Sequence, residues 1–351
     1  MKSSISSSLL WAASESATGV ARADRSPYNS LDKVPTLQGH IPFQIPGKSD
    51  VSASTYYKVF GHLSSGVPPV VALHGGAGGG HEYLLSFTEL WPRYGIPVVF
   101  YDQIGCGAST HLPQLAGDTG FWQESLFVAE LNNLLDHLEL RDGPGFHLLG
   151  QSWGGMLGAA FAASRPRGLQ RLVLASALAS GPLSAQSIRL RRDELPVDVR
   201  TVLDRCIEED DYESPAYREA SKIFQKTFVC RADPLPADLL ISLQHLGEDK
   251  TVYGTMYGPS VFKRNGSLRD WTSISRLLQI MAPTLVYNGE YDTSHDIGQE
   301  PFFELIPRVR WITFPGGSHM CHVDGGGLRD RVLKVVGEFL AQHKANEKAA
   351  T

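Results

Sequence analysis

The sequence has few of the features that mark membrane, disulfide-rich or nucleic-acid-binding proteins. No apolar run approaches the roughly 20 residues that span a bilayer. Only four cysteines occur in 351 residues, and they lack paired spacing, which favours a reducing compartment. The net charge is −5 and no block of Lys and Arg is present, which argues against nucleic acid as a partner. We therefore expect a cytoplasmic protein with neither a membrane nor a nucleic-acid partner.

The remaining composition, 42% hydrophobic and 20% charged, is sufficient for a large globular unit. Residues 1–49 begin with a Ser- and Ala-rich stretch whose apolar run is too short for a secretory signal, and we predict a flexible tail there. Strand-like and helical runs alternate further on, which predicts a mostly parallel sheet covered by helices on both faces. The expected strands are 54–60, 70–73, 97–101, 146–149, 172–175, 283–289 and 309–314.

The alternation breaks over residues 182–270. This segment is rich in charge and helical in character, with no run typical of a buried strand. An insertion of this kind between two strands of a sheet often closes a pocket and sets its specificity. We predict a core of residues 50–181 and 271–345, with residues 182–270 as a helical cap.

Residues 150–154, Gly-Gln-Ser-Trp-Gly, carry the G-x-S-x-G pattern between an apolar strand and a helix of small residues. This context is typical of a nucleophile elbow, in which a strained turn exposes Ser152. The glycines allow backbone to pass closely, and the helix N-terminus supplies partial positive charge. An ordinary Gly-rich turn between strand and helix is the alternative.

A serine nucleophile needs a base to take its proton and a carboxylate to orient that base. Asp292 follows the strand 283–289 and His319 follows the strand 309–314. The chain order Ser, Asp, His is that of the fold in which such elbows occur. Loops at the carboxyl ends of strands are also where open α/β sheets carry their chemistry. We predict Ser152, Asp292 and His319 as the catalytic residues.

Two neighbours compete for these roles. His322 lies one turn beyond His319, and Asp296 lies further from its strand end than Asp292, so we prefer the first of each pair. His319 and His322 also resemble a metal-binding pair with Cys321 between them. Since no third or fourth ligand is close in sequence, we predict neither a metal nor a cofactor.

The apolar run 70–73 leads into the glycine-rich loop 74–80. Backbone N–H groups of such a loop and of the residue after the nucleophile form an oxyanion hole. We assign the N–H groups of Gly76 and Trp153, with Gly75 as the alternative to Gly76. A phosphate-binding loop is disfavoured because no Gly-Lys-Ser/Thr ending is present.

Together these motifs resemble the prolyl aminopeptidase (proline iminopeptidase) family of α/β-hydrolases, peptidase family S33. The likeness extends from about residue 54 to 340. The matching stretches are 74–76, 81–85, 101–107, 150–154, 289–292 and 318–320, with partial matches at 257–259 and 266–271. The resemblance implies an α/β-hydrolase fold with an inserted cap and a serine triad.

Members of that family hold the free amino terminus of the substrate with two glutamates. Val261 replaces the glutamate of the Gly-Pro-x-Glu-Phe motif, and Thr293 replaces the one after the catalytic aspartate. Because a buried charge without its partner costs about 3–5 kcal/mol, we expect a substrate without a free amine, unless Glu82, Glu290 or Asp296 reaches the pocket. The residues expected to line the pocket are Gly75, Val261, Thr293 and Glu82.

We therefore expect a serine hydrolase that cleaves an amide or ester bond of a small molecule through an acyl-enzyme. The lost glutamates favour specialised metabolism over peptide processing. One alternative is a genuine proline iminopeptidase whose amine site is built differently. Another is a non-hydrolytic lyase or cyclase on the same fold.

Overall fold

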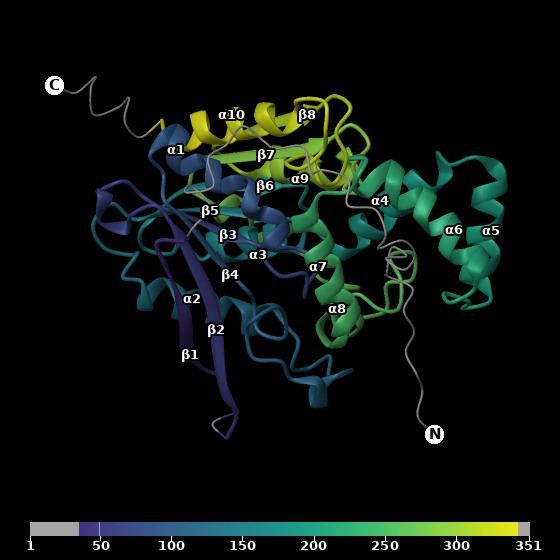
Figure 1. The fold of residues 1–351 in the computed structure, drawn as a ribbon, viewed down its shortest axis with the longest axis horizontal. Helices are drawn as coiled ribbons and strands as arrows, with labels where there is room; N and C mark the ends of the chain where they lie inside the picture. The colour runs from purple at the N-terminus through teal and green to yellow at the C-terminus, as the bar shows by residue number, and fades with distance from the viewer. Residues whose placement is uncertain (1–34, 49, 343–351) are drawn as a thin grey trace, which may run out of the picture.

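The computed structural model describes residues 35–48 and 50–342 (Figure 1). An eight-stranded sheet in the order β1-β2-β4-β3-β5-β6-β7-β8 forms its centre. β1 and β2 are antiparallel to their neighbours and all other pairs are parallel, so the predicted mostly parallel sheet is confirmed. The strands are β1 (Leu37–Gln44), β2 (Ser52–Phe60), β3 (Val70–Leu73), β4 (Val98–Tyr101), β5 (Phe146–Gln151), β6 (Leu169–Ala175), β7 (Thr284–Gly289) and β8 (Val309–Phe314).

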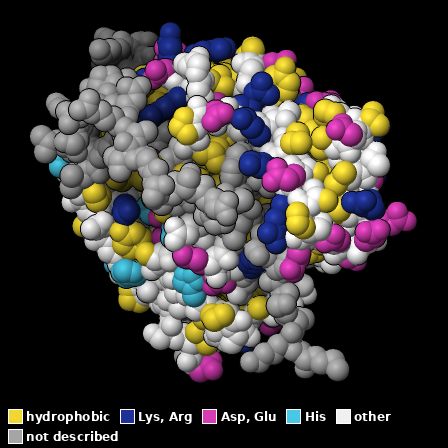
Figure 2. Space-filling view, turned by 45° about the vertical axis from the view of Figure 1, so that its right-hand side comes forward, with side chains coloured by type: hydrophobic (Ala, Val, Ile, Leu, Met, Phe, Trp, Pro, Cys, Tyr) yellow, Lys and Arg dark blue, Asp and Glu magenta, His cyan; other side chains and the backbone are white. Residues whose placement is uncertain are grey.

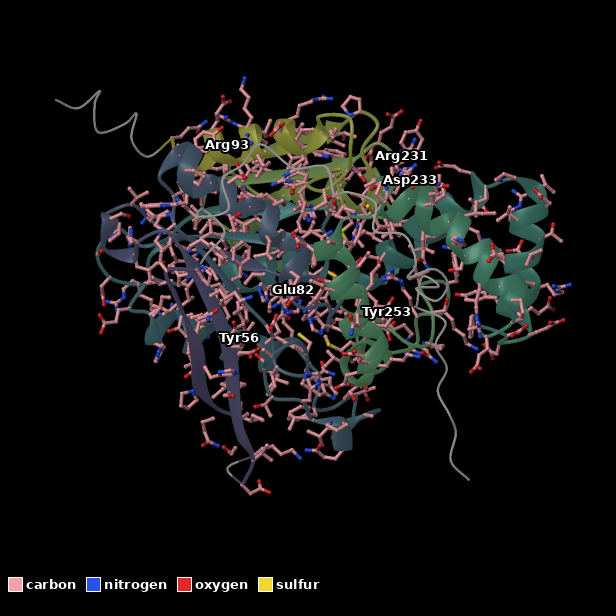
Figure 3. The ribbon with its side chains drawn as sticks, viewed as in Figure 1. Tyr56, Glu82, Arg93, Arg231, Asp233 and Tyr253 are labelled. Carbon is pink, nitrogen blue, oxygen red and sulfur yellow. The ribbon has the colours of Figure 1, made fainter. Side chains whose placement is uncertain are left out.

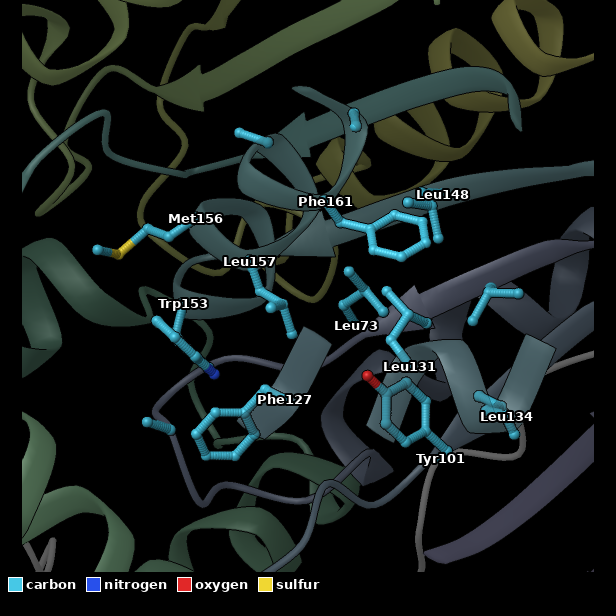
Figure 4. Close-up of a cluster of buried hydrophobic side chains, with 14 of the residues drawn as sticks. Leu73, Tyr101, Phe127, Leu131, Leu134, Leu148, Trp153, Met156, Leu157 and Phe161 are labelled. Atoms are coloured by element: carbon cyan, nitrogen blue, oxygen red, sulfur yellow. The ribbon is translucent and has the colours of Figure 1, made fainter. Parts of the chain in front are cut away.

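Helices cover both faces of the sheet, which is why β3, β4 and β5 are buried along their whole length. In β3, Val71 and Leu73 face one hydrophobic cluster while Val70 and Ala72 face the other. The first face packs against α2 (Glu124–His137), α3 (Trp153–Ala163) and α9 (Asp296–Leu305), as Figure 4 shows in part. The second face packs against the 3-10 helix η3 (Glu82–Glu89), α1 (Leu90–Tyr94) and α10 (Leu328–Leu340).

The strand β1 corrects the prediction that residues 1–49 form a flexible tail. It pairs with β2 over eight residues, with Ile41 opposite Thr55. Ile41, Phe43 and Ile45 alternate with polar or exposed residues and are buried in the core. This period-2 pattern was the missed signal, since the apolar side chains of an edge strand point to one face. Residues 1–34 lie outside the described residues.

Helices fill the segment between β6 and β7. Its two ends pair with each other, because Gly181 N donates to Trp271 O at 2.8 Å and Ser273 N donates to Ala179 O at 3.0 Å. In Figure 1, α4, α5 and α6 extend to the right of the sheet, while α7 lies against η3. The helices are α4 (Gly181–Asp193), α5 (Val197–Glu208), α6 (Pro215–Phe224), the π-helix η5 (Gln225–Val229), α7 (Ala237–Glu248), α8 (Thr251–Met256) and the 3-10 helix η6 (Ile274–Gln279).

Charges of both signs are mixed on the face drawn in Figure 2, where basic and acidic side chains are interspersed with single hydrophobic ones. None of the helices in the described ranges has both the length and the apolar character required to cross a bilayer. All four cysteines are buried and carry free thiols.

Candidate active site

The turn between β5 and α3 consists of Ser152 alone. Its backbone has φ 55° and ψ −119°, a conformation that side-chain-bearing residues rarely adopt. A Cβ on Gly150 would lie 2.2 Å from the oxygen of Gly154, and a Cβ on Gly154 would lie 2.0 Å from the oxygen of Leu73. Both glycines are therefore required for the tight packing that presents the serine.

Asp292 and His319 meet at the carboxyl ends of β7 and β8. Asp292 is fully buried, and its Oδ1 lies 2.7 Å from Nδ1 of His319. The carboxylate also accepts hydrogen bonds from the backbone N–H groups of Ser294 (2.7 Å) and Gly289 (3.3 Å). Because a carboxylate accepts hydrogen bonds, the proton of His319 resides on Nδ1, and Nε2 is the basic nitrogen.

The two alternative residues lie elsewhere. His322 is buried against the ring of Phe87, with 5.3 Å between the ring centroids. Burial lowers the pKa of His322 to about 3, so this ring stays neutral at physiological pH. Asp296 accepts a hydrogen bond from Nδ2 of Asn288 at 2.7 Å. Neither residue lines the cavity that Ser152 and His319 share.

The glycine loop after β3 runs beside the nucleophile, since a Cβ on Gly75 would lie 2.8 Å from Cβ of Ser152. The amide of Gly75 donates to the hydroxyl of Tyr83 at 2.6 Å. Because the Gly75 amide already has this acceptor, the next amide, that of Gly76, is favoured as an oxyanion donor. Trp153 is the first residue of α3, where N–H groups have no partner within the helix. The N–H groups of Gly76 and Trp153 therefore stay the predicted oxyanion donors.

Ser152 and His319 open into a cavity of about 160 Å³, which has room for a group of about the size of a benzene ring. Its walls are mainly apolar and include Val261 and Thr293 as well as Gly75 and Gly76. No Asp or Glu is found among the lining residues within the described ranges. Apolar side chains from the inserted helices that contribute are Ile188, Phe224, Leu239, Leu243, Leu246 and Tyr253.

Residues 70–331 match the family model described as alpha/beta hydrolase family. This chain belongs to that family. It is 35% identical over 275 residues to the proline iminopeptidase of Lactiplantibacillus plantarum, covering 77% of this chain and 92% of the relative. The solved structure of VinJ is 40% identical, covers 88% of this chain and 99% of its own, and superposes with a TM-score of 0.80.

The solved proline iminopeptidase of Mycobacterium smegmatis is 36% identical, with coverage of 89% and 100% and a TM-score of 0.80. The chain is thus an α/β-hydrolase of the prolyl aminopeptidase type, and a serine hydrolase of peptidase family S33. The fold and the family predicted from the sequence are confirmed.

Arg191 is a residue of this α/β-hydrolase that the sequence did not single out. The sequence placed it only in a charged helical run, but its side chain is buried. Its Nε donates to the main-chain oxygen of Asp292 at 2.7 Å, and Nη2 donates to that of Glu290 at 2.5 Å. The loop that carries Asp292 is therefore fastened to α4.

The loop that carries His319 is fastened to the inserted segment as well. His319 N donates to Phe228 O at 3.0 Å, and Met320 N donates to Val229 O at 2.9 Å. Both acceptors belong to η5. The π-helix was not predictable from the sequence pattern, because a single extra residue per turn leaves no periodic signal.

Glu82 corrects the prediction of a pocket acid, because it does not line the cavity. It is the first residue of η3 (Figure 3), with Oε1 3.4 Å from Nε2 of His245 on α7 and 3.7 Å from Nδ1 of His81. Burial raises the pKa of Glu82, but its interactions with His245 and His81 together outweigh this, and the net shift of the pKa is downward. This carboxylate is thus already paired. Glu290, another candidate acid, accepts from Gly316 N at 2.8 Å on the surface.

The same region holds the described side chains that could share a metal ion. The ligand atoms of His81, Glu82 and Asp102 lie within 4.8 Å of one another. Asp102 already accepts hydrogen bonds from Nδ1 of His81 (2.7 Å) and from the amide of Ala108 (2.9 Å). The bond from His81 joins two loops, and the bond from Ala108 closes the loop that carries Asp102. These bonds give the three side chains a structural role.

Proposed function

We propose that this α/β-hydrolase cleaves an amide or ester bond of a small molecule through a covalent acyl-enzyme. Ser152 attacks the carbonyl, His319 accepts its proton at Nε2, and Asp292 holds the imidazole by its Nδ1–H. The observation that carries the proposal is the 2.7 Å contact between Asp292 and His319, beside a cavity lined by His319 and Ser152.

The attack places a negative charge on the substrate oxygen. The N–H groups of Gly76 and Trp153 donate hydrogen bonds to this oxygen. The partial positive charge at the N-terminus of α3 stabilises the negative charge as well. Protonated His319 then gives its proton to the departing amine or alkoxide. A water molecule, deprotonated by the same nitrogen, attacks the acyl-enzyme carbonyl. Protonated His319 then returns the proton to Oγ of Ser152 as the ester bond breaks and the acid is released.

We further propose that the substrate lacks a free α-amine and belongs to specialised metabolism. Support comes from the cavity walls, which include Val261 and Thr293 and hold no Asp or Glu among the described residues. The resemblance aligns these two positions with glutamates of the family. An ammonium group in such a cavity would lose its hydration without gaining an ion pair.

A genuine proline iminopeptidase is the second candidate. The enzymes of that name from L. plantarum and M. smegmatis align with this chain over 92% and 100% of their lengths. An ammonium could be held by neutral oxygens instead of carboxylates. Ser184 favours this candidate, because it lines the cavity and its buried hydroxyl has no hydrogen-bond partner among the described residues.

We propose that residues 182–270 act as a cap on a catalytic core made of residues 50–181 and 271–345, to which β1 is added. The cap contributes much of the apolar cavity wall, so its composition sets specificity. We also infer a reducing compartment such as the cytoplasm, since all four cysteines carry free thiols.

The test is a paired assay with proline 4-nitroanilide and a short-chain 4-nitrophenyl ester, on wild type and Ser152→Ala. We expect ester turnover that Ser152→Ala abolishes, and little or no turnover of the anilide. Efficient anilide cleavage would contradict the hypothesis that the substrate lacks a free amine, which rests on Val261 and Thr293. It would establish proline iminopeptidase activity. Ester turnover that persists in Ser152→Ala would exclude Ser152 as the nucleophile.

A further inference from the structure

Arg264 provides the one permanent charge among the described residues that line the cavity. The other lining side chains are apolar or neutral, apart from the imidazole of His319. The segment that carries Arg264 also carries Val261, which the sequence aligns with a glutamate of the family motif. The cavity wall therefore holds a positive charge and, among the described residues, no carboxylate.

The guanidinium of Arg264 has no carboxylate partner. Within the described residues, no Asp or Glu lies within 4.0 Å of it, in contrast to arginines such as Arg276, which pairs with Glu124 at 2.7 Å. Its Nε donates to the main-chain oxygen of Val261 at 3.3 Å. Its Cζ atom lies over the ring of Tyr257, another cavity residue, at 5.0 Å from the ring centroid. These contacts orient the side chain but leave both Nη groups without an acceptor in the described structure.

A guanidinium with two free Nη groups matches the two oxygens of a carboxylate, and both hydrogen bonds are charge-assisted. The aromatic ring beneath it and the apolar walls reduce competition from water and strengthen such a pair. The same charge repels an ammonium group. The side chain thus selects for the opposite charge to the one that a free amino terminus carries.

We propose that Arg264 is a specificity-determining residue that binds a carboxylate of the substrate. The preferred substrates are then amides or esters that carry a carboxylate in the part facing the Tyr257–Arg264 wall. This inference rests on the proposed function, because it concerns the substrate of the reaction at Ser152.

The test compares two esters with acyl chains of five carbons. The 4-nitrophenyl monoester of glutaric acid carries a terminal carboxylate, and 4-nitrophenyl pentanoate is neutral. Rates measured with Ser152→Ala are subtracted, since the glutarate ester also hydrolyses by itself. The readout is the ratio of the two kcat/KM values, anionic over neutral, in wild type and in three variants.

In Arg264→Met we expect this ratio to fall by about 10- to 100-fold, as for the loss of a charge-assisted hydrogen bond. Arg264→Lys keeps the charge without the planar fork and is expected to lie between Arg264→Met and wild type. Arg269→Met is the matched control, because Arg269 is exposed and pairs with Asp270 at 2.7 Å; it should keep the wild-type ratio. A ratio that stays within twofold of wild type in Arg264→Met overturns the proposal.

A binding measurement separates this proposal from the proposed function. Calorimetric titration of glutarate into Ser152→Ala needs no catalysis, and adding Arg264→Met should weaken the affinity at least tenfold. If neither ester is turned over in a Ser152-dependent manner, the hydrolase proposal fails and the titration still decides the role of Arg264. Equal binding with and without Arg264, or no binding at all, contradicts the carboxylate site. If Arg264→Met does not fold, Arg264→Gln takes its place.

Discussion

The Nε atom of Arg191 lies 2.7 Å from the main-chain oxygen of Asp292, so helix α4 of the inserted segment holds the loop that carries Asp292. The guanidinium also binds Glu194 at 2.8 Å, which fixes its orientation. The inserted segment thus contacts the loop that carries Asp292 and also lines the cavity. Arg191 acts through Asp292 and is a positioning residue.

Replacing Arg191 with Met should lower kcat about 10- to 100-fold with a smaller change in KM, since hydrogen bonds from a charged group contribute about 1.5–3 kcal/mol. The pH profile of kcat/KM should shift, because the base loses its fixed carboxylate. Steady-state kinetics from pH 5 to 9 measure both effects. Arg192→Met is the control, as Arg192 pairs with Asp204 on α5 at 3.0 Å. Unchanged kcat and pH profile, with only a lower melting temperature, would indicate a purely structural role.

The hydroxyl of Tyr83 accepts from the amide of Gly75 and donates to Oε1 of Gln151 at 2.7 Å. Tyr83→Phe removes both bonds while keeping the ring, so the glycine loop loses a fixed point beside Ser152. We expect kcat to fall about tenfold with KM nearly unchanged, because the oxyanion donors act in the transition state. Tyr212→Phe is the control and should match wild type, because the hydroxyl of Tyr212 donates to Asp210 in the inserted segment. A rise in KM alone would place Tyr83 in substrate binding instead.

Asp292→Asn should reduce kcat by up to about 10⁴-fold, since an amide can hold the imidazole in the wrong tautomer. Asp296→Asn is its matched partner and should cost less than threefold, because Asp296 bonds to Asn288, away from His319. The comparison decides between the two candidate acids. A larger loss from Asp296→Asn would reverse the assignment.

The sequence predicts best those placements that depend on local chain geometry. The elbow needs glycines on either side of Ser152 because of packing within a few residues, and that need is visible as a motif. Asp292 and His319 each follow an apolar strand, so strand order alone brings them to one sheet edge.

Hydrogen-bond and ion-pair partners that lie far apart in the sequence leave no comparable motif. Arg191 is 101 residues away from Asp292 in sequence and resembles any solvated arginine of an amphipathic helix. Glu82 was a plausible pocket acid until His245, on a helix more than 160 residues later, proved to be its partner. Such pairings depend on how α4 and α7 pack on the core. Side chains of several elements determine that packing together, so the spacing of residues along the sequence does not reveal it.

Two histidine–carboxylate pairs join α7 to the core and make its attachment dependent on pH. The pair with Glu82 raises the pKa of His245. Burial lowers the pKa of His111, but the interactions with Asp249 and with the main-chain oxygen of Gly107 together outweigh this, and the net shift is upward. A raised histidine pKa contributes stability below the unfolded value of about 6.5, and this contribution is lost as pH rises through the folded pKa.

Hydrogen exchange corrected for intrinsic rates should therefore show α7 (Ala237–Glu248) opening more often at pH 8.5 than at pH 6. The double variant His111→Gln, His245→Gln should remove most of this difference. Helix α10, on the same core, serves as the internal reference. Equal protection of α7 at both pH values in wild type would contradict the assignment.

Glu130 on α2 is completely buried, and burial raises its pKa to about 8. Its Oε1 accepts hydrogen bonds from Oγ1 of Thr55 at 2.6 Å and from the amide of Ile104 at 2.9 Å. The folded state thus keeps a proton that the unfolded chain releases above pH 4.5. Stability is lost as pH rises from 4.5 to 8 and is constant beyond that range.

Glu130→Gln keeps an acceptor oxygen and cannot ionise, so it should be more stable than wild type at pH 8.5 by roughly 2–4 kcal/mol. At pH 4 the two proteins should differ little. Urea unfolding at both pH values measures the difference, with the exposed Glu139→Gln as a control that should behave as wild type. If Glu130→Gln is destabilised equally at pH 4 and 8.5, the carboxylate is ionised in the folded protein and its hydrogen bonds outweigh its burial.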